Sequence, residues 1–554
     1  MNKKVCSFPI LFALLALVIG TCAVVFPASA QAAPTSIGSI TVSGTVASSY
    51  DAYQIFDANV IDGDNDAKIA TDLAWASDAV RDAVLPVLHS AGMPNSQTTA
   101  QEAAEWLNTD SHLTSALSAQ LARSLQSSGA VSVALNAGRA AELPCGYWLI
   151  VADDDAIAQG EAGTAPIMAL VGGGAVTVKP KAATPKVSKH VLEDSTAAWQ
   201  KAADATVADD LYWRLSATVP AGLTAYDTYA VQFVDTMSAG LDPSKVAASM
   251  RVYVAAGADG GFGAVSAGKD GHVDTEPAKG WTDITAQCWV SADGKTFTVR
   301  TGDLIAALGG ADAFTAGARV VAVYNAPLNS ACNHGIAKGN PNQVYLRYPR
   351  SPLSDQSGDA GFTRTPSDDA TAYTWDLALT KRGSDGDKPL AGAVLSIADD
   401  RGRTLAADGT WDAEGKATVT TGEDGRVTVS GVDSGKLEVR ELKAPKGYTA
   451  FEGTRSVTVK AEGLDVDQVA AAKPKLTITA ESPLRADSAD GSTGSLEASL
   501  INTPTGTPPS ITTGGFMPST GDMAMYAAAA AAVTGAALIV VALLVKRGGG
   551  SHKE

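Results

Sequence analysis

Three strand-like segments in the C-terminal part of the chain each place one polar residue on an otherwise apolar face. Alternate residues of a β-strand point to the same side of a sheet, and this parity puts Lys381, Glu441 and Asn502 on the apolar sides of their segments. The apolar residues that share these faces are Tyr373, Trp375, Leu377 and Leu379 in the first segment, Leu437 and Val439 in the second, and Leu496, Ala498 and Leu500 in the third. We therefore expect a lysine, a glutamate and an asparagine to face one protein core.

Buried lysine and glutamate side chains need partners, because an unpaired charge in a protein interior is costly. One interpretation is an ion pair between Lys381 and Glu441, and another is a lysine that reaches water beyond the rim of the core. A third is an intramolecular isopeptide bond. Burial lowers the pKa of a lysine and raises the pKa of a carboxylic acid. A protonated Glu441 would then polarise the Asn502 amide, the neutral Lys381 amine would attack it, and ammonia would leave. Parity leaves all three interpretations open.

A parallel set of residues lies earlier in the chain. Lys189, Asp235 and Asn342 also fall on apolar faces of strand-like segments. Their neighbours on these faces are Val187 and Val191 for the lysine, Val231, Phe233 and Met237 for the aspartate, and Val344, Leu346 and Tyr348 for the asparagine. This second set offers the same three functional groups.

The segments around these residues have the pattern of β-sandwiches. Residues 181–365 and 366–503 contain short alternating strands separated by turns rich in glycine and aspartate, which is typical of all-β sandwiches. Residues 36–180 contain similar strands and a helical stretch within residues 99–127. The predicted fold is mostly β, with tandem immunoglobulin-like sandwiches and an inserted helix in the first. Domains usually contain roughly 100–200 residues, so the chain length suits three of them.

The N-terminal residues 1–30 have the composition of a signal peptide. Lys3 and Lys4 precede an apolar stretch, and the small residues Ala28, Ser29 and Ala30 follow it. This order is typical of a secretion signal that is removed on export, and the small residues favour it over a membrane anchor. We therefore expect a secreted protein.

The C-terminal end has three parts in a fixed order. A segment rich in proline, glycine, threonine and serine, residues 504–516, is expected to form an extended stalk. Residues 524–545 carry no charge and could span a membrane as a helix, with the basic tail 546–554 remaining in the cytoplasm. Between the stalk and the apolar residues lies the pentapeptide Met517-Pro518-Ser519-Thr520-Gly521.

This order resembles the LPxTG sorting signal of Gram-positive surface proteins, with Met517 in place of leucine. The resemblance implies that sortase cleaves between Thr520 and Gly521 and passes the threonine acyl group to an amine. The expected partners are therefore sortase and, through a covalent bond, peptidoglycan. The expected location is the cell wall, reached through a membrane-spanning precursor.

Composition excludes several other functions. The formal net charge is −17 and no basic cluster lies outside the two tails, which argues against nucleic acid as a partner. The sequence contains no Gly-x-Ser-x-Gly motif, P-loop or zinc-ligand spacing. We therefore expect no enzyme, no cofactor and no metal site, apart from a single internal bond-forming reaction per site.

Three cysteines remain after removal of the signal peptide, namely Cys145, Cys288 and Cys332. An oxidising exterior permits one disulfide among them. Cys288 and Cys332 are the expected pair because both fall within residues 181–365, and Cys145 is then left over.

The segment around Glu441 resembles a motif of sortase-assembled pilins. Its sequence, Glu441-Leu442-Lys443-Ala444-Pro445-Lys446-Gly447-Tyr448, matches their E-box, E-x-x-A-P-x-G-Y. Leu379-Thr380-Lys381, followed by Leu390-Ala391-Gly392-Ala393, is similar to the start of their prealbumin-like module. The resemblance implies that Lys381 and Asn502 are bonded and that Glu441 is the catalytic acid.

Residues 181–365 resemble the fimbrial isopeptide-forming D2 domain. Residues 234–241 are similar to its acid-bearing strand, and residues 342–348 match its Asn-x-Val-x-Leu-x-Tyr pattern. The resemblance implies a bond between Lys189 and Asn342, with Asp235 as the acid. The family often continues with Ser-Asn-Asn-Pro, where this chain has Pro349-Arg350-Ser351-Pro352. A bond to an asparagine at that place would be missing here.

A further resemblance concerns polymerisation. Val178-Lys179-Pro180-Lys181 is similar to the Val-Tyr-Pro-Lys motif of backbone pilins, which implies that Lys181 attacks the sortase intermediate of the next subunit. Lys179 and Lys186 are alternatives. Residues 50–57 and 143–150 resemble the pilin N-terminal domain.

Together these features predict a backbone pilin that polymerises with identical subunits into a cell-surface fimbria. The alternative is a wall-anchored or pilus-tip adhesin of the same architecture, with a host ligand. A tip adhesin is a further expected partner of the backbone subunit.

Overall fold

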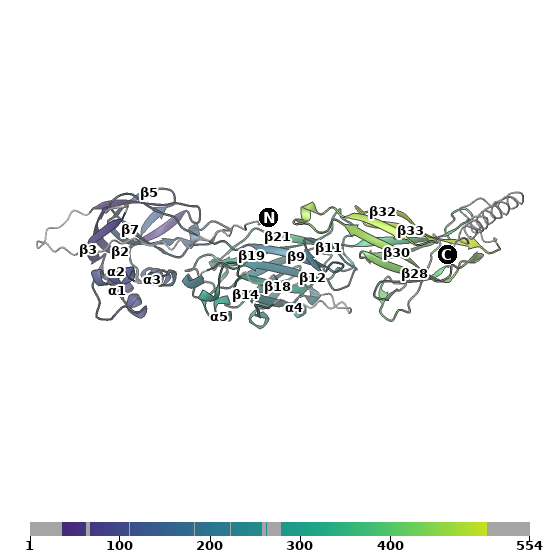
Figure 1. The fold of residues 1–554 in the computed structure, drawn as a ribbon, viewed down its shortest axis with the longest axis horizontal. Coiled ribbons are helices and arrows are strands. Elements are labelled where there is room, and N and C mark those ends of the chain that lie inside the picture. The colour runs from purple at the N-terminus through teal and green to yellow at the C-terminus, as the bar shows by residue number, and fades with distance from the viewer. Residues whose placement is uncertain are drawn as a thin grey trace, which may run out of the picture.

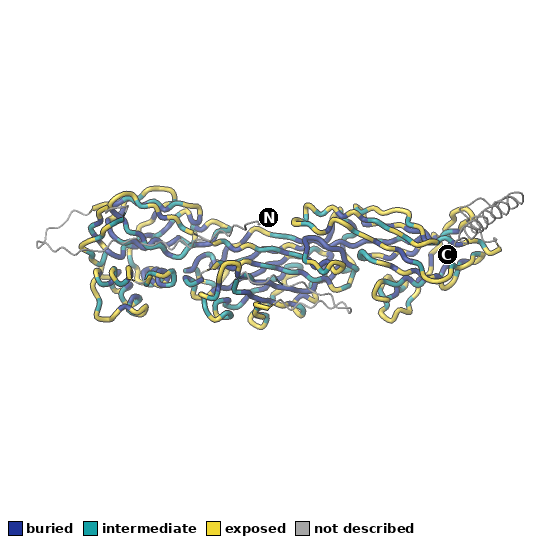
Figure 2. The backbone as a smooth tube through the Cα atoms, viewed as in Figure 1, coloured by how far each residue is buried: buried dark blue, intermediate teal, exposed yellow. Residues whose placement is uncertain are grey.

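The computed structural model describes residues 36–62, 67–109, 111–181, 183–221, 223–257, 262 and 279–506. Figure 1 shows three β-rich domains that follow one another along a rod, which confirms the predicted fold class. In Figure 2 the buried backbone runs through the inner strands of each domain. The predicted signal peptide, sorting motif, apolar segment and tail lie outside the described residues. None of the described helices is both long and apolar enough to cross a membrane.

The first domain combines two sheets with three helices. One sheet has the strand order β3-β2-β6-β7, with β4 beside β2, and the other has the order β5-β1-β8. The helical stretch predicted within residues 99–127 forms two helices, because Thr99 and Thr114 each accept a hydrogen bond at a helix N-terminus. The elements are β1 (Ile37–Val42), β2 (Ser49–Asp62), β3 (Lys68–Trp75), α1 (Asp78–Ser90), α2 (Ala100–Asn108), α3 (Ser115–Ser128), β4 (Val133–Asn136), β5 (Ala140–Pro144), β6 (Gly146–Ala152), β7 (Ile167–Val171) and β8 (Val176–Val178).

The second domain is a sandwich of two sheets around one apolar core. The sheets have the strand orders β10-β9-β12-β18-β14-β15 and β11-β21-β19-β13-β17-β16, with β20 beside β19. The elements are β9 (Val187–Glu193), β10 (Ala198–Gln200), β11 (Ala202–Asp204), β12 (Tyr212–Thr218), β13 (Gln232–Met237), α4 (Val246–Ser249), β14 (Arg251–Ala255), β15 (Trp281–Asp283), β16 (Trp289–Asp293), β17 (Thr296–Arg300), α5 (Leu304–Ala307), β18 (Arg319–Asn325), β19 (Asn340–Pro349), β20 (Phe362–Arg364) and β21 (Asp368–Tyr373).

The third domain is a second sandwich with its own core. Its sheets have the strand orders β27-β22-β33-β29, with β32 beside β33, and β25-β24-β23-β28-β30-β31, with β26 beside β23. The elements are β22 (Trp375–Gly383), β23 (Val394–Ala398), β24 (Thr404–Leu405), β25 (Trp411–Asp412), β26 (Val419–Thr420), β27 (Arg426–Val432), β28 (Gly435–Lys443), β29 (Tyr448–Thr449), β30 (Thr454–Glu462), β31 (Lys475–Ala480), β32 (Leu484–Asp490) and β33 (Ser495–Pro504).

The boundary between the second and third domains differs from the prediction. The sequence pattern predicts that the third domain begins at residue 366 and that Tyr373 lies in its first strand. In the structure Tyr373 ends β21, which pairs with β19 of the second domain, and β22 begins at Trp375. Because only Thr374 separates the two strands, their side-chain alternation looks continuous in the sequence.

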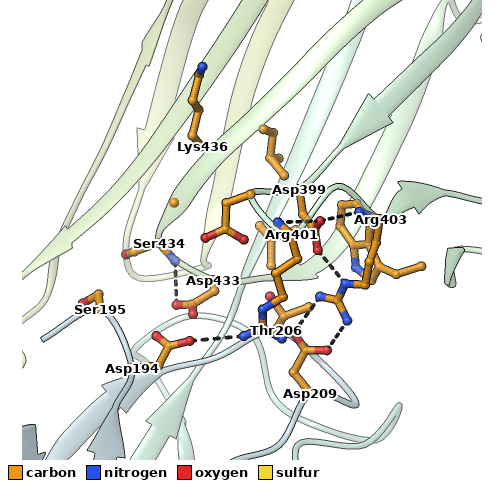
Figure 3. A pocket seen from close by; sticks show the side chains of 15 residues that line it. Asp194, Ser195, Thr206, Asp209, Asp399, Arg401, Arg403, Asp433, Ser434 and Lys436 are labelled. Carbon is orange, nitrogen blue, oxygen red and sulfur yellow. Dashed lines mark hydrogen bonds and ion pairs between the residues drawn. The ribbon is translucent and has the colours of Figure 1, made fainter. Parts of the chain in front are cut away.

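The second and third domains also contact each other through charged side chains (Figure 3). Arg403 donates two hydrogen bonds to Asp209, at 2.6 and 2.7 Å. Asp204, a buried residue of the second domain, accepts hydrogen bonds from the Trp375 indole at 2.6 Å and from the Ser434 backbone at 3.0 Å. The junction therefore joins residues of both domains through polar bonds.

The predicted disulfide between Cys288 and Cys332 is wrong, because the structure has both as free thiols, together with Cys145. Cys288 lies near Gly302, which follows β17. Arg300 of β17 pairs with Gln232 at the start of β13. Cys332 packs against Gly240, just after the end of β13. A strand of six residues spans about 20 Å, whereas the Cα atoms of a disulfide lie within roughly 7 Å of each other.

Candidate functional site

The third domain brings together the first lysine, acid and asparagine set. Lys381 lies on β22 and Asn502 on the neighbouring parallel strand β33, where Lys381 pairs with Leu500 and Gly383 pairs with Asn502. This register puts the lysine and asparagine on the same face. Glu441 reaches them from β28 of the facing sheet. The sequence parity therefore located all three side chains in one interior.

The three functional groups are within reach of one another. The Lys381 Nζ atom lies 3.6 Å from Glu441 Oε1 and donates a hydrogen bond to the Leu500 carbonyl oxygen at 3.2 Å. Asn502 Nδ2 donates to both oxygens of Glu441, at 2.9 and 3.0 Å. The backbone nitrogen of Phe451 also donates to Glu441, at 3.1 Å. Glu441 thus contacts both the amine and the amide.

Burial sets the electrostatics of this site. The side chains of Lys381 and Glu441 are both 0% exposed, which excludes the interpretation that the lysine reaches water. Burial lowers the pKa of Lys381 from 10.5 to about 8, although Glu441 acts in the opposite direction. The lowered pKa favours the neutral form of the amine. The site can therefore supply an amine nucleophile, a carboxyl group and an amide within one dry interior.

The second domain brings together the other set. Lys189 lies on β9 of one sheet, whereas Asp235 on β13 and Asn342 on β19 belong to the facing sheet. Asp235 pairs with Val344 and Asn342 pairs with Met237, so the two polar residues are diagonal neighbours. The amine of Lys189 forms an ion pair with Asp235 Oδ2, and all three side chains are fully buried.

The charges of this second pair are shifted towards neutrality. Burial lowers the pKa of Lys189 to about 8, against the attraction of Asp235. Burial also raises the pKa of Asp235, against the opposing effects of Lys189 and Tyr324. Both shifts favour a neutral amine beside a protonated acid.

Tyr324 is a member of this site that the sequence analysis missed. It comes from β18, and its hydroxyl lies 2.8 Å from Lys189 Nζ, 3.0 Å from Asp235 Oδ2 and 2.8 Å from Asn342 Nδ2. In the sequence it continues the apolar alternation of Val320 and Ala322, and so it looks like an ordinary core residue. Only the arrangement of the strands places its hydroxyl among the three groups.

The segment Pro349-Arg350-Ser351-Pro352, where the chain departs from the pattern of the D2 domain, does not remove the asparagine from this site. Asn342 bonds to the Tyr324 hydroxyl, whereas the amide of the nearby buried Asn340 is occupied by backbone groups of Asn333 and Ala372. The divergent segment instead contacts the first domain. The Arg350 carbonyl accepts a hydrogen bond from the Gly163 nitrogen at 2.7 Å.

The predicted linking lysine lies between the first two domains. Lys181 follows β8 and precedes β9, and it is exposed, as are Lys179 and Lys186. Thr520, its expected reaction partner in another subunit, lies outside the described residues. No group of metal-ligating side chains occurs within the described part of the chain.

Comparisons with known proteins agree with the geometry of the third domain. Residues 376–473 match the family described as the SpaA prealbumin-like fold domain. The trypsin-resistant surface T6 protein of Streptococcus pyogenes serotype M6 is 30% identical over 143 residues, which cover 24% of this chain and 24% of that protein. The chain thus matches about a quarter of the length of this curated relative.

Solved structures of pilins also align with most of the chain. The T6 backbone pilin of serotype M6 Streptococcus pyogenes has 17% identity and a TM-score of 0.46, and the alignment covers 86% of this chain and 100% of that one. The major pilin SpaD of Corynebacterium diphtheriae has 14% identity and a TM-score of 0.41, with coverage of 85% and 98%. The third domain is a prealbumin-like domain, and the chain is similar to Gram-positive pilins.

Proposed function

We propose that this chain is the backbone subunit of a sortase-assembled fimbria on a Gram-positive cell, with isopeptide bonds inside its second and third domains. The observation that carries the proposal is the recurrence of one arrangement. Two consecutive domains each bury a lysine amine, a carboxyl group and an asparagine amide; Glu441 contacts the other two groups in the third domain, and the Tyr324 hydroxyl connects the three groups in the second. The prealbumin-like match of the third domain gives further support.

The reaction in the third domain needs only the groups that are present. The neutral Lys381 amine attacks Cγ of Asn502, and a bond forms between Nζ and Cγ. The bond between Cγ and Nδ2 breaks, one proton moves from Nζ to Nδ2, and ammonia leaves. Glu441 can carry this proton because it lies close to both nitrogens. The reaction occurs once per site and requires no cofactor, so the chain is not a turnover enzyme.

The strands that carry these residues explain what the bonds achieve. Lys381 lies on the first strand of the third domain and Asn502 on the last, so tension along the rod acts directly on the two linked strands. In the second domain, a bond between Lys189 and Asn342 would join the two facing sheets. A covalent tie at these places blocks unravelling from the strand ends. We infer that the bonds let each subunit carry tension along a fimbria.

Sortase would join the subunits and anchor the polymer. The Thr520 acyl group of one subunit is transferred to the exposed Lys181 of the next, and the last transfer in the series joins the polymer to peptidoglycan. The net charge of −17 suits an exterior protein surface.

Intact-mass measurement of the recombinant ectodomain tests the internal bonds. The measured mass should be lower than the sequence mass by one ammonia for each bond, or two in all. Lys381→Ala should restore one of the two losses, and Lys189→Ala the other. A wild-type mass equal to that of the processed sequence would refute the proposal for both domains.

A further inference from the structure

In the second domain, the Tyr324 hydroxyl contacts Lys189, Asp235 and Asn342, whereas Asp235 by itself does not reach the Asn342 amide. In the third domain Glu441 hydrogen-bonds directly to Asn502 and lies 3.6 Å from Lys381. In the second domain Asp235 contacts Lys189 and Tyr324. Among the described residues, the hydrogen bond of the Asn342 side chain goes to Tyr324 and not to Asp235. The acid and the amide are therefore linked through Tyr324.

We propose that Tyr324 is a catalytic residue of isopeptide formation in the second domain, where its hydroxyl relays a proton from Lys189 to the departing nitrogen of Asn342. This inference rests on the proposed function, because it concerns the reaction assigned there to the second domain. It adds a residue and a proton path that the third domain does not need.

The relay balances without another reactant. Lys189 Nζ attacks Cγ of Asn342, after which Nδ2 is an amine with a free electron pair. The Tyr324 hydroxyl gives its proton to Nδ2 and receives one from Nζ. The bond between Cγ and Nδ2 breaks, ammonia leaves, and Tyr324 regains its starting form. The distances of 2.8 Å to Nζ and to Nδ2 are those of proton-transfer partners.

The surroundings of Tyr324 suit this role. The residue is fully buried, and burial together with Asp235 raises the pKa of its hydroxyl well above 10. It therefore keeps its proton until the reaction needs it. Its ring packs edge-on against Phe297, with the ring centroids 4.9 Å apart, and its backbone pairs with Trp213. The hydroxyl is thus held in position before the reaction, as effective catalysis requires.

The experiment compares Tyr324→Phe with the matched control Tyr348→Phe. Tyr348 is a fully buried tyrosine of the same domain, and its hydroxyl has no hydrogen-bond partner among the described residues. Each full-length variant is expressed in the producing bacterium, and synthesis is then stopped. At successive times the chain is digested, and the peptide that links Lys189 to Asn342 is quantified. The peptide that links Lys381 to Asn502 serves as an internal standard.

Tyr324→Phe should form the second-domain link about 100-fold or more slowly, since a general acid–base group contributes roughly that factor or more. Its third-domain link should form at the wild-type rate, and Tyr348→Phe should match the wild type in both. Near-ultraviolet circular dichroism equal to that of Tyr348→Phe would show that the slow variant is folded. A rate for Tyr324→Phe within twofold of the wild type would overturn the relay, as would equal slowing by Tyr348→Phe. If the wild type itself forms only the third-domain link, the proposed second-domain reaction fails and the relay fails with it.

Discussion

Arg403 of the third domain holds Asp209 of the second through two hydrogen bonds, at 2.6 and 2.7 Å. The Asp209 side chain is only 12% exposed and also contacts Arg401 at 2.8 Å. Paired, charge-assisted hydrogen bonds are stronger than neutral ones and fix the relative orientation of their partners. This ion pair therefore limits bending between the two domains that carry the proposed covalent bonds.

Removal of the Asp209 carboxylate should loosen the junction. Asp209→Ala leaves Arg401 and Arg403 without a shared partner, and we expect a loss of about 2 kcal/mol in the free energy of unfolding. Small-angle scattering of the recombinant ectodomain should show a broader distribution of interatomic distances. The control is Asp359→Ala, because Asp359 is 84% exposed and pairs with Arg347 within the second domain. Equal scattering curves for the two variants would contradict a role for Asp209 in rigidity.

The same junction should make stability depend on pH. Burial, followed by the nearby Asp204, raises the pKa of Glu193 from 4.5 to about 7. The other ionisable groups around Glu193 and Asp204 are Asp194, Asp400, Asp433 and Arg401. Because its folded pKa is raised, the protonated Glu193 contributes stability that is fully present below pH 4.5 and is lost as the pH rises through 7.

Calorimetry of the chain at pH 5 and at pH 8 measures this effect. The melting temperature should be lower at pH 8, and Glu193→Gln should reduce the difference because the amide cannot ionise. Glu423→Gln, at an exposed position of the third domain, serves as the control and should leave the difference unchanged. A pH dependence that is the same in Glu193→Gln and in the wild type would assign it to another group.

Glu441→Ala should prevent the bond in the third domain, because no other carboxyl group within the described residues bonds to the Asn502 amide. The difference between the sequence mass and the measured mass should then be smaller than in the wild type by one ammonia. The domain should still fold, but it should melt at a lower temperature and become sensitive to protease. The bond between Lys381 and Asn502 closes a long loop, which removes roughly 4–5 kcal/mol of chain entropy from the unfolded state. The variant without this bond should therefore be less stable.

The control for this variant lies on the same strand. Glu438 belongs to β28 but pairs with Lys436 on the exposed side, so Glu438→Ala should retain the mass loss. A Glu441→Ala protein that keeps the wild-type mass loss would remove Glu441 from the reaction and leave the bond itself intact.

The sequence predicted the third-domain site because strand parity is a local property. The residues beside Lys381, Glu441 and Asn502 in the sequence indicate which face of each strand is buried. Within one sandwich, the buried faces of the strands pack around a common core. The contacts of Tyr324 depend instead on which strands are neighbours and which face each other across the core. The alternation of residues within one strand does not show this long-range arrangement. The disulfide prediction failed for the same reason, since Cys288 and Cys332 share a domain but lie near opposite ends of β13.

The helices and the domain boundary show a second limit of the sequence analysis. The helical periodicity of residues 99–127 gave no sign of the break between α2 and α3, which the cap at Thr114 explains. The start of the third domain was displaced because β21 and β22 are both apolar and alternate in the same way. In each case the type of element was predicted and its end was not, because ends depend on single capping or pairing residues.

Polymerisation depends on an acceptor amine on every subunit, and Lys181 is the proposed one. It lies after β8, outside the sheets of both neighbouring domains, and it is exposed. The buried Lys189, in contrast, is enclosed by Asp235 and Tyr324 and is not available to a second protein. An exposed lysine can enter the sortase site and lose its proton there.

Lys181→Ala should therefore abolish the high-mass ladder in immunoblots of cell-wall extracts while leaving monomer on the wall, since anchoring uses only Thr520. Thr520→Ala should remove both products. The matched controls are Lys179→Ala and Lys186→Ala, which replace the exposed lysines on either side and should leave the ladder intact. Loss of the ladder in one of these controls, with its retention in Lys181→Ala, would move the role to that residue. If the wild-type chain forms no ladder when expressed with its own sortases, it is anchored as a single subunit, and the wall-anchored adhesin becomes the better interpretation.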